Sequence, residues 1–99
     1  MTHQTKLLLS VLLDAPGEES YGFELSQASG LPSGTIYPIL RRLEDRGVLA
    51  SRWEFLDESK EGRRRRRYYR LTGQGERVAR TAIAAQTPAL RLLVPGWAS

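Results

Sequence analysis

The sequence predicts a mainly α-helical fold with one small β-hairpin, on three observations. Two segments with helical periodicity are separated by a short Gly-Leu-Pro turn, an alternating stretch with aromatic residues begins at Leu49, and a second short strand follows a run of arginines. The chain has 99 residues, which fits a single domain. A chain of this size buries roughly 60–70% of its unfolded surface, so a sizeable ligand site is expected between subunits rather than inside one.

The first helix is expected over residues 5–13. Its apolar residues cover a wide arc: Leu7, Leu8, Leu9, Val11, Leu12 and Leu13. A stripe this wide fits a helix that contacts both its own core and a second subunit, and it fits a thoroughly buried helix equally well.

A second helix is expected from Tyr21 to Ser29. Ser20 is a suitable N-cap and Gly30 a suitable stop. The residues expected to reach the core are Phe23, Leu25 and Ala28.

Residues 31–47 form the segment around which the chain is organised. Its apolar residues recur at i, i+3, i+4 and i+7, the spacing of one helical face: Ile36, Ile39, Leu40 and Leu43. The other side is small and hydroxylic near its start and then basic: Gly34, Thr35, Tyr37, Arg41, Arg42 and Asp45. A helix, a short turn and a second helix of this kind form the helix-turn-helix arrangement, whose second helix enters the DNA major groove. An ordinary amphipathic helix with a solvated basic face is the alternative.

Pro38 constrains where this helix begins. A proline in a helix interior removes a backbone hydrogen bond, but the third helical residue needs no such donor. With Thr35 as the N-cap, Pro38 takes that third position. The helix is therefore expected to begin near residues 33–35 and to end at Arg46, with Gly47 as the C-terminal glycine.

Two strands are expected after Gly47. Residues 49–56 alternate, with Leu49, Ser51, Trp53 and Phe55 on one face, and residues 68–71 read as the second strand. Residues 57–67 between them form a polar hairpin loop, in which Gly62 can adopt a positive φ.

The positive charge is concentrated in this loop. The chain carries a net charge of +4, whereas residues 60–70 alone hold seven basic residues and one acidic residue, a balance of +6. Five successive arginines, Arg63 to Arg67, repel one another in an ordered hairpin, and a phosphate backbone relieves that repulsion. Arginines at the tip of the hairpin would be able to enter a minor groove. A solvated charged loop is the alternative.

The last predicted helix covers residues 74–86. Thr72 can cap it, Val78, Ala79, Ala82, Ile83 and Gln86 line one side, and the Gly73-Gln74-Gly75 sequence is interpreted as turn chemistry. Residues 89–94 form an apolar tail, followed by Trp97, that needs a partner to cover it.

Several function classes lack support in the sequence. The chain has one histidine and no cysteine, and its carboxylates are scattered, so neither a catalytic set nor a metal cluster is expected. No enzyme activity and no cofactor are therefore predicted. No apolar run approaches the ~18 residues of a membrane span and no signal-peptide pattern is present, which favours a cytoplasmic protein with no membrane partner. Arginine outnumbers lysine 13 to 2, which hints at a GC-rich genome.

Several motifs together closely resemble the PadR family of bacterial transcriptional regulators. They are Tyr21-Gly-Phe-Glu-Leu25, Gly34-Thr-Ile-Tyr-Pro38, Arg52-Trp-Glu54, Gly62-Arg63 and Tyr68-Tyr-Arg-Leu-Thr72. The resemblance implies a winged helix-turn-helix over residues 1–73 and, over residues 74–99, a short C-terminal dimerisation helix and tail of the compact kind. It also implies a homodimer that represses at inverted-repeat operators, often including its own.

The resemblance and the basic residues together define the expected DNA-binding residues. From the recognition segment they are Ser33, Gly34, Thr35, Tyr37, Pro38 and Arg41, and from the wing Lys60, Gly62, Arg63, Arg64 and Arg65. Two departures from the family pattern stand out. Pro32 replaces a common serine, and the unbroken arginine run predicts phosphate contact that is stronger and less selective for sequence.

The same resemblance assigns a dimer interface to the first and last helices. The residues expected there are Leu8, Val11, Val78, Ile83, Leu90 and Leu93. Some compact relatives bind flat aromatic compounds between the subunits, and Trp97 would line such an effector site here.

The sequence therefore predicts a DNA-binding transcriptional regulator that acts as a dimeric repressor on double-stranded DNA. Two other classes remain open, namely an architectural protein that binds nucleic acid without sequence preference and a winged-helix module that binds protein. The salt dependence and sequence preference of DNA binding separate these classes.

Overall fold

The computed structural model describes residues 1–86, in which five helices and three strands are present. The helices are α1 (His3–Leu13), α2 (Gly22–Ser29), α3 (Ser33–Asp45), α4 (Glu58–Glu61) and α5 (Gly73–Gln86). The strands are β1 (Ser20–Tyr21), β2 (Leu49–Trp53) and β3 (Arg67–Leu71).

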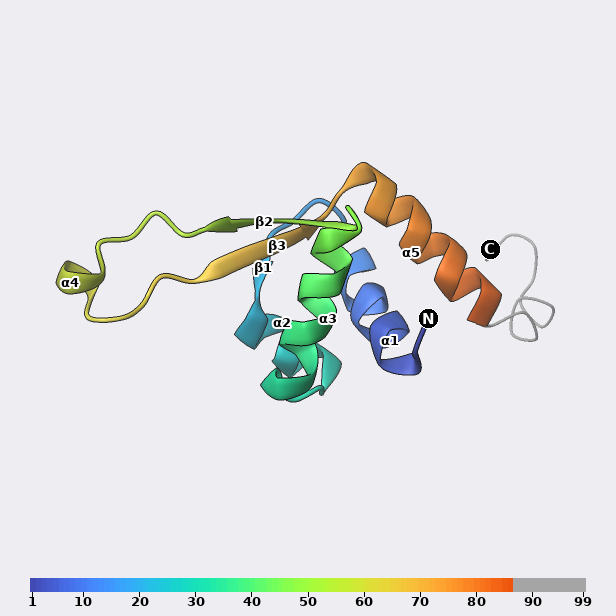
Figure 1. Ribbon diagram of the computed structural model, residues 1–99, viewed down its shortest axis with the longest axis horizontal. Helices are drawn as coiled ribbons and strands as arrows, with labels where there is room; N and C mark the ends of the chain where they lie inside the picture. Colours follow the sequence, from blue (N-terminus) through green and yellow to red (C-terminus); the bar gives the residue numbers. More distant parts are fainter. Residues whose placement is uncertain (87–99) are drawn as a thin grey trace.

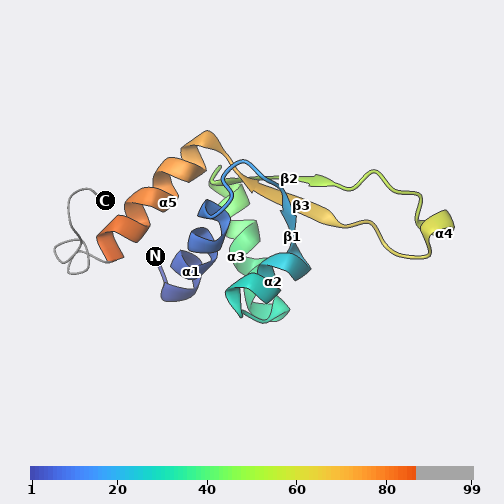
Figure 2. The ribbon, with the colours of Figure 1, turned by 180° about the vertical axis from the view of Figure 1, so that it is seen from behind.

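Four of the helices, α1, α2, α3 and α5, lie at one end of the molecule and the β2–β3 hairpin extends to the other (Figures 1 and 2). Helices α1, α2 and α3 pack together, and α5 lies alongside α1. The β2–β3 hairpin extends away from them and carries α4 at its far end. This arrangement is a winged helix-turn-helix, as the sequence predicts, with the hairpin as the wing.

One apolar core holds the helices to the base of the sheet. Its largest fully buried side chains come from α1, α2 and α3: Leu8, Leu9, Leu25, Ile36 and Leu40. Ile39 and Leu43 are 3% and 4% exposed, so the predicted inner face of α3 is confirmed. The core leaves the other side of this helix free.

The strand β1 was not expected from the sequence. Ser20 pairs with Tyr69 and Tyr21 with Tyr68, which makes a three-stranded antiparallel sheet in the order β1-β3-β2. Ser20 is therefore a strand residue and not the N-cap of α2. Tyr21 takes the cap position, and its backbone N–H donates to Glu24 Oε1 at 3.2 Å. The predicted hairpin is thus part of a larger sheet.

Two of the three core residues predicted for α2 are wrong. Leu25 is 2% exposed, but Phe23 is 62% exposed and Ala28 also faces solvent. The reason is the starting point of the helix. Because β1 precedes α2 directly, the helix turns Leu25 inward and Phe23 toward the wing.

Helix α3 begins at Ser33, within the predicted range of residues 33–35, but its N-cap is not Thr35. Pro32 is its N-cap, and the Pro32 carbonyl accepts hydrogen bonds from the backbone N–H groups of Thr35 and Ile36 at 2.9 and 3.0 Å. Thr35 is therefore inside the helix, and Pro38 lies in its interior rather than in the third position. The Gly34 carbonyl loses its helical donor, but Gly34 is exposed, so water can replace it. At the other end Arg46 is the C-cap, and Gly47 has a φ of 76°, as predicted.

The wing is shorter in β-structure than the alternation predicts. Pairing ends with Trp53 opposite Arg67, followed by one hydrogen bond from Glu54 N–H to the Arg66 carbonyl at 2.8 Å. Phe55 was expected on the same strand face as Leu49, but it lies beyond the end of β2 and is fully exposed. No part of the helical body reaches this far along the wing, so the alternating residues after Trp53 have no apolar core to pack against.

Thr72 caps α5, as predicted, and Gly75 has a different role from the one predicted. The backbone N–H of Gly75 donates to Thr72 Oγ1 at 2.8 Å. A Cβ added at Gly75 would lie 1.8 Å from the Val48 carbonyl oxygen. Gly75 is therefore a helical residue that lets α5 approach the turn before β2, and it does not form a turn.

Candidate nucleic-acid interface

The outer side of α3 is free to meet a ligand along its whole length. Ser33, Gly34, Pro38 and Arg41 are exposed, and Tyr37 is 50% exposed. Thr35 is half-buried. The residues predicted from the recognition segment thus form one continuous surface, small at the start of the helix and basic farther along.

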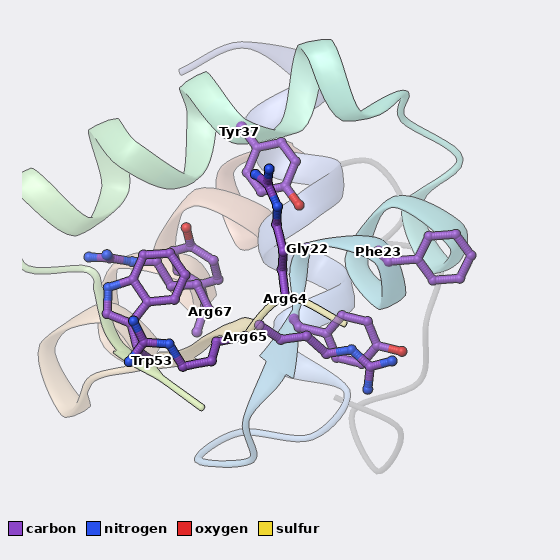
Figure 3. Close-up of a pocket in the computed structure, with 10 residues that line it drawn as sticks. Gly22, Phe23, Tyr37, Trp53, Arg64, Arg65 and Arg67 are labelled. Carbon is purple, nitrogen blue, oxygen red and sulfur yellow. The ribbon is translucent and has the colours of Figure 1, made fainter. Parts of the chain in front are cut away.

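Gly22 positions Tyr37 on this surface. A Cβ added at Gly22 would lie 2.4 Å from the Tyr37 hydroxyl oxygen and 2.6 Å from its ring carbon Cζ. Figure 3 shows the Tyr37 ring beside Gly22. The absence of a side chain at residue 22 therefore lets the tyrosine lie against the start of α2, a function that the sequence reading did not assign to this glycine.

The far end of the wing is acidic, not basic. Helix α4 carries Glu58 and Glu61 beside Lys60, and Asp57 caps it by accepting from the Ser59 and Lys60 backbone N–H groups at 3.1 and 3.4 Å. Residues Arg63–Arg67, which we call the arginine arm, follow Gly62 and return toward the helices. The prediction that arginines occupy the tip is therefore wrong. They lie along the side of the wing that runs back to α3.

Arg63 is already paired within the wing. Its Nη1 lies 2.8 Å from Glu54 Oε1 and its Nη2 lies 3.2 Å from Glu54 Oε2, a two-pronged ion pair. This pair, with a further hydrogen bond from the Arg66 backbone N–H at 3.3 Å, lowers the pKa of Glu54 to about 2. Arg63 therefore ties the two sides of the wing together. Arg64 and Arg65 are exposed and form no ion pair within residues 1–86.

Aromatic rings separate the arginines of the arm. The guanidinium carbons of Arg65 and Arg67 lie 6.0 and 5.1 Å from the centre of the Trp53 ring, and that of Arg66 lies 4.4 Å from the Tyr21 ring. These contacts relieve part of the repulsion between neighbouring arginines. The aromatic residues of the two hairpin strands were evident from the sequence, whereas β1, which brings Tyr21 to the arm, has no local sequence pattern.

A hollow of about 680 Å³ lies between the start of α2, helix α3 and the arginine arm (Figure 3). Aromatic and cationic groups line it: Tyr21, Gly22, Phe23, Tyr37, Trp53, Arg64, Arg65, Arg66, Arg67 and Tyr69. The recognition surface and the wing thus face one shared space. Its positive charge and exposed rings suit an anionic chain that carries sugars and bases.

The comparisons with known proteins agree with this geometry. Residues 8–81, more than half of the chain, match the model of the transcriptional regulator PadR-like family. The chain belongs to this family. A comparison with curated proteins gives no match.

Solved structures of PadR regulators have the same fold. The chain is 34% identical to a PadR family transcriptional regulator from Eggerthella lenta, with a TM-score of 0.68 over 89% of this chain and 78% of that one. A PadR family regulator from Clostridium difficile is 24% identical, with a TM-score of 0.71 over 93% and 95% of the two chains. The more distant BpsR of Bordetella bronchiseptica is 17% identical, with a TM-score of 0.73 over 97% and 67%, and shares the fold.

Family membership identifies the protein as a DNA-binding transcriptional regulator rather than an enzyme. Within residues 1–86, no group of histidines and carboxylates is suited to a metal ion, and no helix has the length and apolarity to cross a membrane.

Proposed function

We propose that this PadR regulator is a homodimer that represses transcription from inverted-repeat operators in the cytoplasm. One observation supports it most strongly. The exposed side of α3 and the arginine arm border the same cationic hollow, so one duplex can meet both at once. Two such surfaces in a symmetric dimer would read two half-sites about one helical turn apart.

The recognition residues divide by chemistry. Ser33, Gly34 and Pro38 would let the α3 backbone approach the DNA, while Thr35, Tyr37 and Arg41 would donate to base edges or phosphates in the major groove. Because the start of α3 is small and exposed, it is the part best suited to enter the groove.

The wing would hold the adjacent backbone. Arg64 and Arg65 are the exposed cations best placed to contact phosphates or a narrow minor groove. Lys60 lies farther out, within the acidic α4, and Gly62 is the C-cap of that helix. Arg63 would contribute chiefly by shaping the wing through Glu54.

The dimer interface would lie on α1 and α5. Val11, Val78 and Ile83 are half-buried there and keep apolar surface for a partner. Leu8 is 0% exposed inside the chain's own core, so it has no surface left and is removed from the predicted interface. Leu90 and Leu93 lie outside the described residues.

Light scattering should give the mass of two chains, and a stable monomer at micromolar concentration would contradict the proposal.

A small aromatic effector between the subunits remains part of the proposal. Trp97, the residue predicted to line that site, lies outside the described residues. The DNA binding of BpsR is regulated by 6-hydroxynicotinic acid, and the likeness of BpsR to this chain is one of fold alone.

Fluorescence anisotropy at two salt concentrations tests the proposal. The two probes are the native region upstream of the gene and a shuffled duplex of equal composition. We expect a preference of about 10³ or more for the native region. Equal binding that weakens steeply with salt would instead indicate an architectural protein, and binding to neither would indicate a protein-interaction module.

A further inference from the structure

A small polar network joins the recognition helix to the root of the arginine arm. Arg67 Nη2 donates to Glu44 Oε2 and Oε1 at 3.3 and 3.4 Å, and Arg67 Nε donates to Ser51 Oγ at 3.0 Å. The Ser51 hydroxyl in turn donates to Glu44 Oε2. Glu44 thus binds both strands of the wing, since Ser51 belongs to β2 and Arg67 to β3.

The network continues to the exposed aromatic residue of the wing. Trp53 is paired across the sheet with Arg67, and the Arg67 guanidinium carbon lies 5.1 Å from the centre of the Trp53 ring. The Arg67 guanidinium therefore contacts a carboxylate of α3 and also the ring of Trp53 at the end of β2. Its backbone begins β3, so these contacts are made at the point where residues 63–66 join the sheet.

Stability alone explains little of this network. The Arg67 and Glu44 side chains are 37% and 30% exposed, and ion pairs at that exposure contribute little to the free energy of unfolding. A carboxylate close to a DNA-binding surface also repels phosphates. Glu44 therefore opposes binding through its charge, unless its contact with Arg67 serves binding in another way.

We propose that Glu44 is a positioning residue that sets the angle between α3 and the arginine arm, and that this angle determines how strongly the protein prefers its operator over other DNA. The proposal rests on the proposed function, because it presumes that α3 and the arm engage one duplex together. With the angle fixed, the arm reaches phosphates only when α3 is seated on its matching bases. With the angle free, the arm binds any nearby backbone.

Glu44→Gln and Asp45→Asn form a matched pair for the test. Each removes one negative charge, at adjacent positions of α3. Asp45 is exposed and forms no ion pair within residues 1–86, so its substitution changes the charge without touching the network. Arg67→Lys is a second probe of the network, since it keeps the positive charge but loses the planar guanidinium.

The first measurement needs no DNA. The chain has two tryptophans, so in a Trp97→Phe background the fluorescence reports Trp53 alone. We expect acrylamide to quench Trp53 more strongly in Glu44→Gln and in Arg67→Lys than in Asp45→Asn, because Arg67 no longer lies over the ring. Equal quenching in all variants would overturn the proposal.

The second measurement is the ratio of affinities for the operator and for shuffled DNA. We expect Glu44→Gln and Arg67→Lys to lower this ratio roughly five- to tenfold, with binding to shuffled DNA unchanged or tighter, and Asp45→Asn to keep it within about twofold. Equal ratios for Glu44→Gln and Asp45→Asn would overturn the positioning role. If the wild-type protein itself shows no preference, it is the proposed function that fails, and the quenching result still decides whether Glu44 orients Arg67.

Discussion

The helical body and the arginine arm are stabilised by different forces. In the body, Leu8, Leu9 and Leu40 are completely buried, and α5 packs so closely that residue 75 has no room for a Cβ. The arginine arm, which leads into β3 from the far end of the wing, does not pack on the apolar core. It is held by the Glu54–Arg63 ion pair and by arginines that lie over Trp53 and Tyr21, all at least partly exposed to solvent.

Because of this difference, the stability of the fold and the binding of DNA depend on different parts of the molecule. Apolar burial holds the fold and depends little on ionic strength, whereas exposed charge contacts weaken as salt screens them. The parts of the molecule that would touch DNA are those whose internal contacts a phosphate backbone can replace. Substitutions in the body should therefore change folding, and substitutions in the arm should change binding at unchanged stability.

The largest effect on folding should come from the body. Leu40→Ala removes a completely buried side chain and should lower the free energy of unfolding by about 2–5 kcal/mol. Phe55→Ala removes a ring that is fully exposed on the wing and should change it by no more than about 0.5 kcal/mol. Urea denaturation measures both. A similar loss from the two variants would show that the wing contributes to the core.

The largest effect on DNA binding should come from the arm. Replacing Arg64, Arg65 and Arg66 by alanine should lower the slope of log affinity against log salt by up to about 2.7, since each phosphate contact contributes roughly 0.9. A control that replaces Arg70, Arg77 and Arg80 removes the same charge elsewhere and should change the slope less. Equal slopes for the two triple variants would mean that only net charge matters. Both proteins should unfold at nearly the wild-type urea concentration.

A smaller effect is expected where the body supports the recognition surface. Gly22→Ala should displace the Tyr37 ring and weaken operator binding about fivefold, the value of one hydrogen bond of about 1 kcal/mol. In a Tyr37→Ala background the same substitution should change nothing further. Additive losses in the double variant would show that Gly22 acts on something other than Tyr37.

The smallest effect concerns pH. Pairing with Arg63 lowers the pKa of Glu54 from 4.5 to about 2, so the pair contributes fully above pH 4.5 and is lost as the pH falls toward 2. Between pH 7 and 5 the carboxyl should not titrate and the wing should keep its structure. The side-chain carboxyl carbon shift of Glu54 in NMR spectra measures this. A midpoint near 4.5 would mean that the pair does not form in solution.

Elements that bury one face were predictable from the sequence. The four apolar residues of α3 and the Thr72 cap were placed correctly, because periodicity and capping chemistry are local. The N-cap of α3 was wrongly assigned to Thr35, because Pro32 takes that position with its backbone carbonyl alone, and no side chain reveals this.

The remainder of the site depends on pairing between distant segments. The strand β1 consists of two residues and forms by pairing with the free edge of β3. A strand this short has no local sequence pattern that would predict it. Consequently the contacts of Tyr21 with the arm and the exposure of Phe23 could not be predicted. The motif Gly34-Thr-Ile-Tyr-Pro38 indicated the recognition surface, whereas the spacing between Gly22 and Tyr37 gave no sign of their contact.

Hydroxyl-radical footprinting on the native upstream duplex tests the central claim most directly. A dimer that seats two copies of α3 and two arms should protect two symmetric backbone patches, separated by about one helical turn or a multiple of it. The Arg64, Arg65 and Arg66 variant should lose the protection flanking each patch while the central protection persists. Uniform protection along the duplex, or a single unpaired patch, would contradict the dimeric, site-specific regulator proposed above.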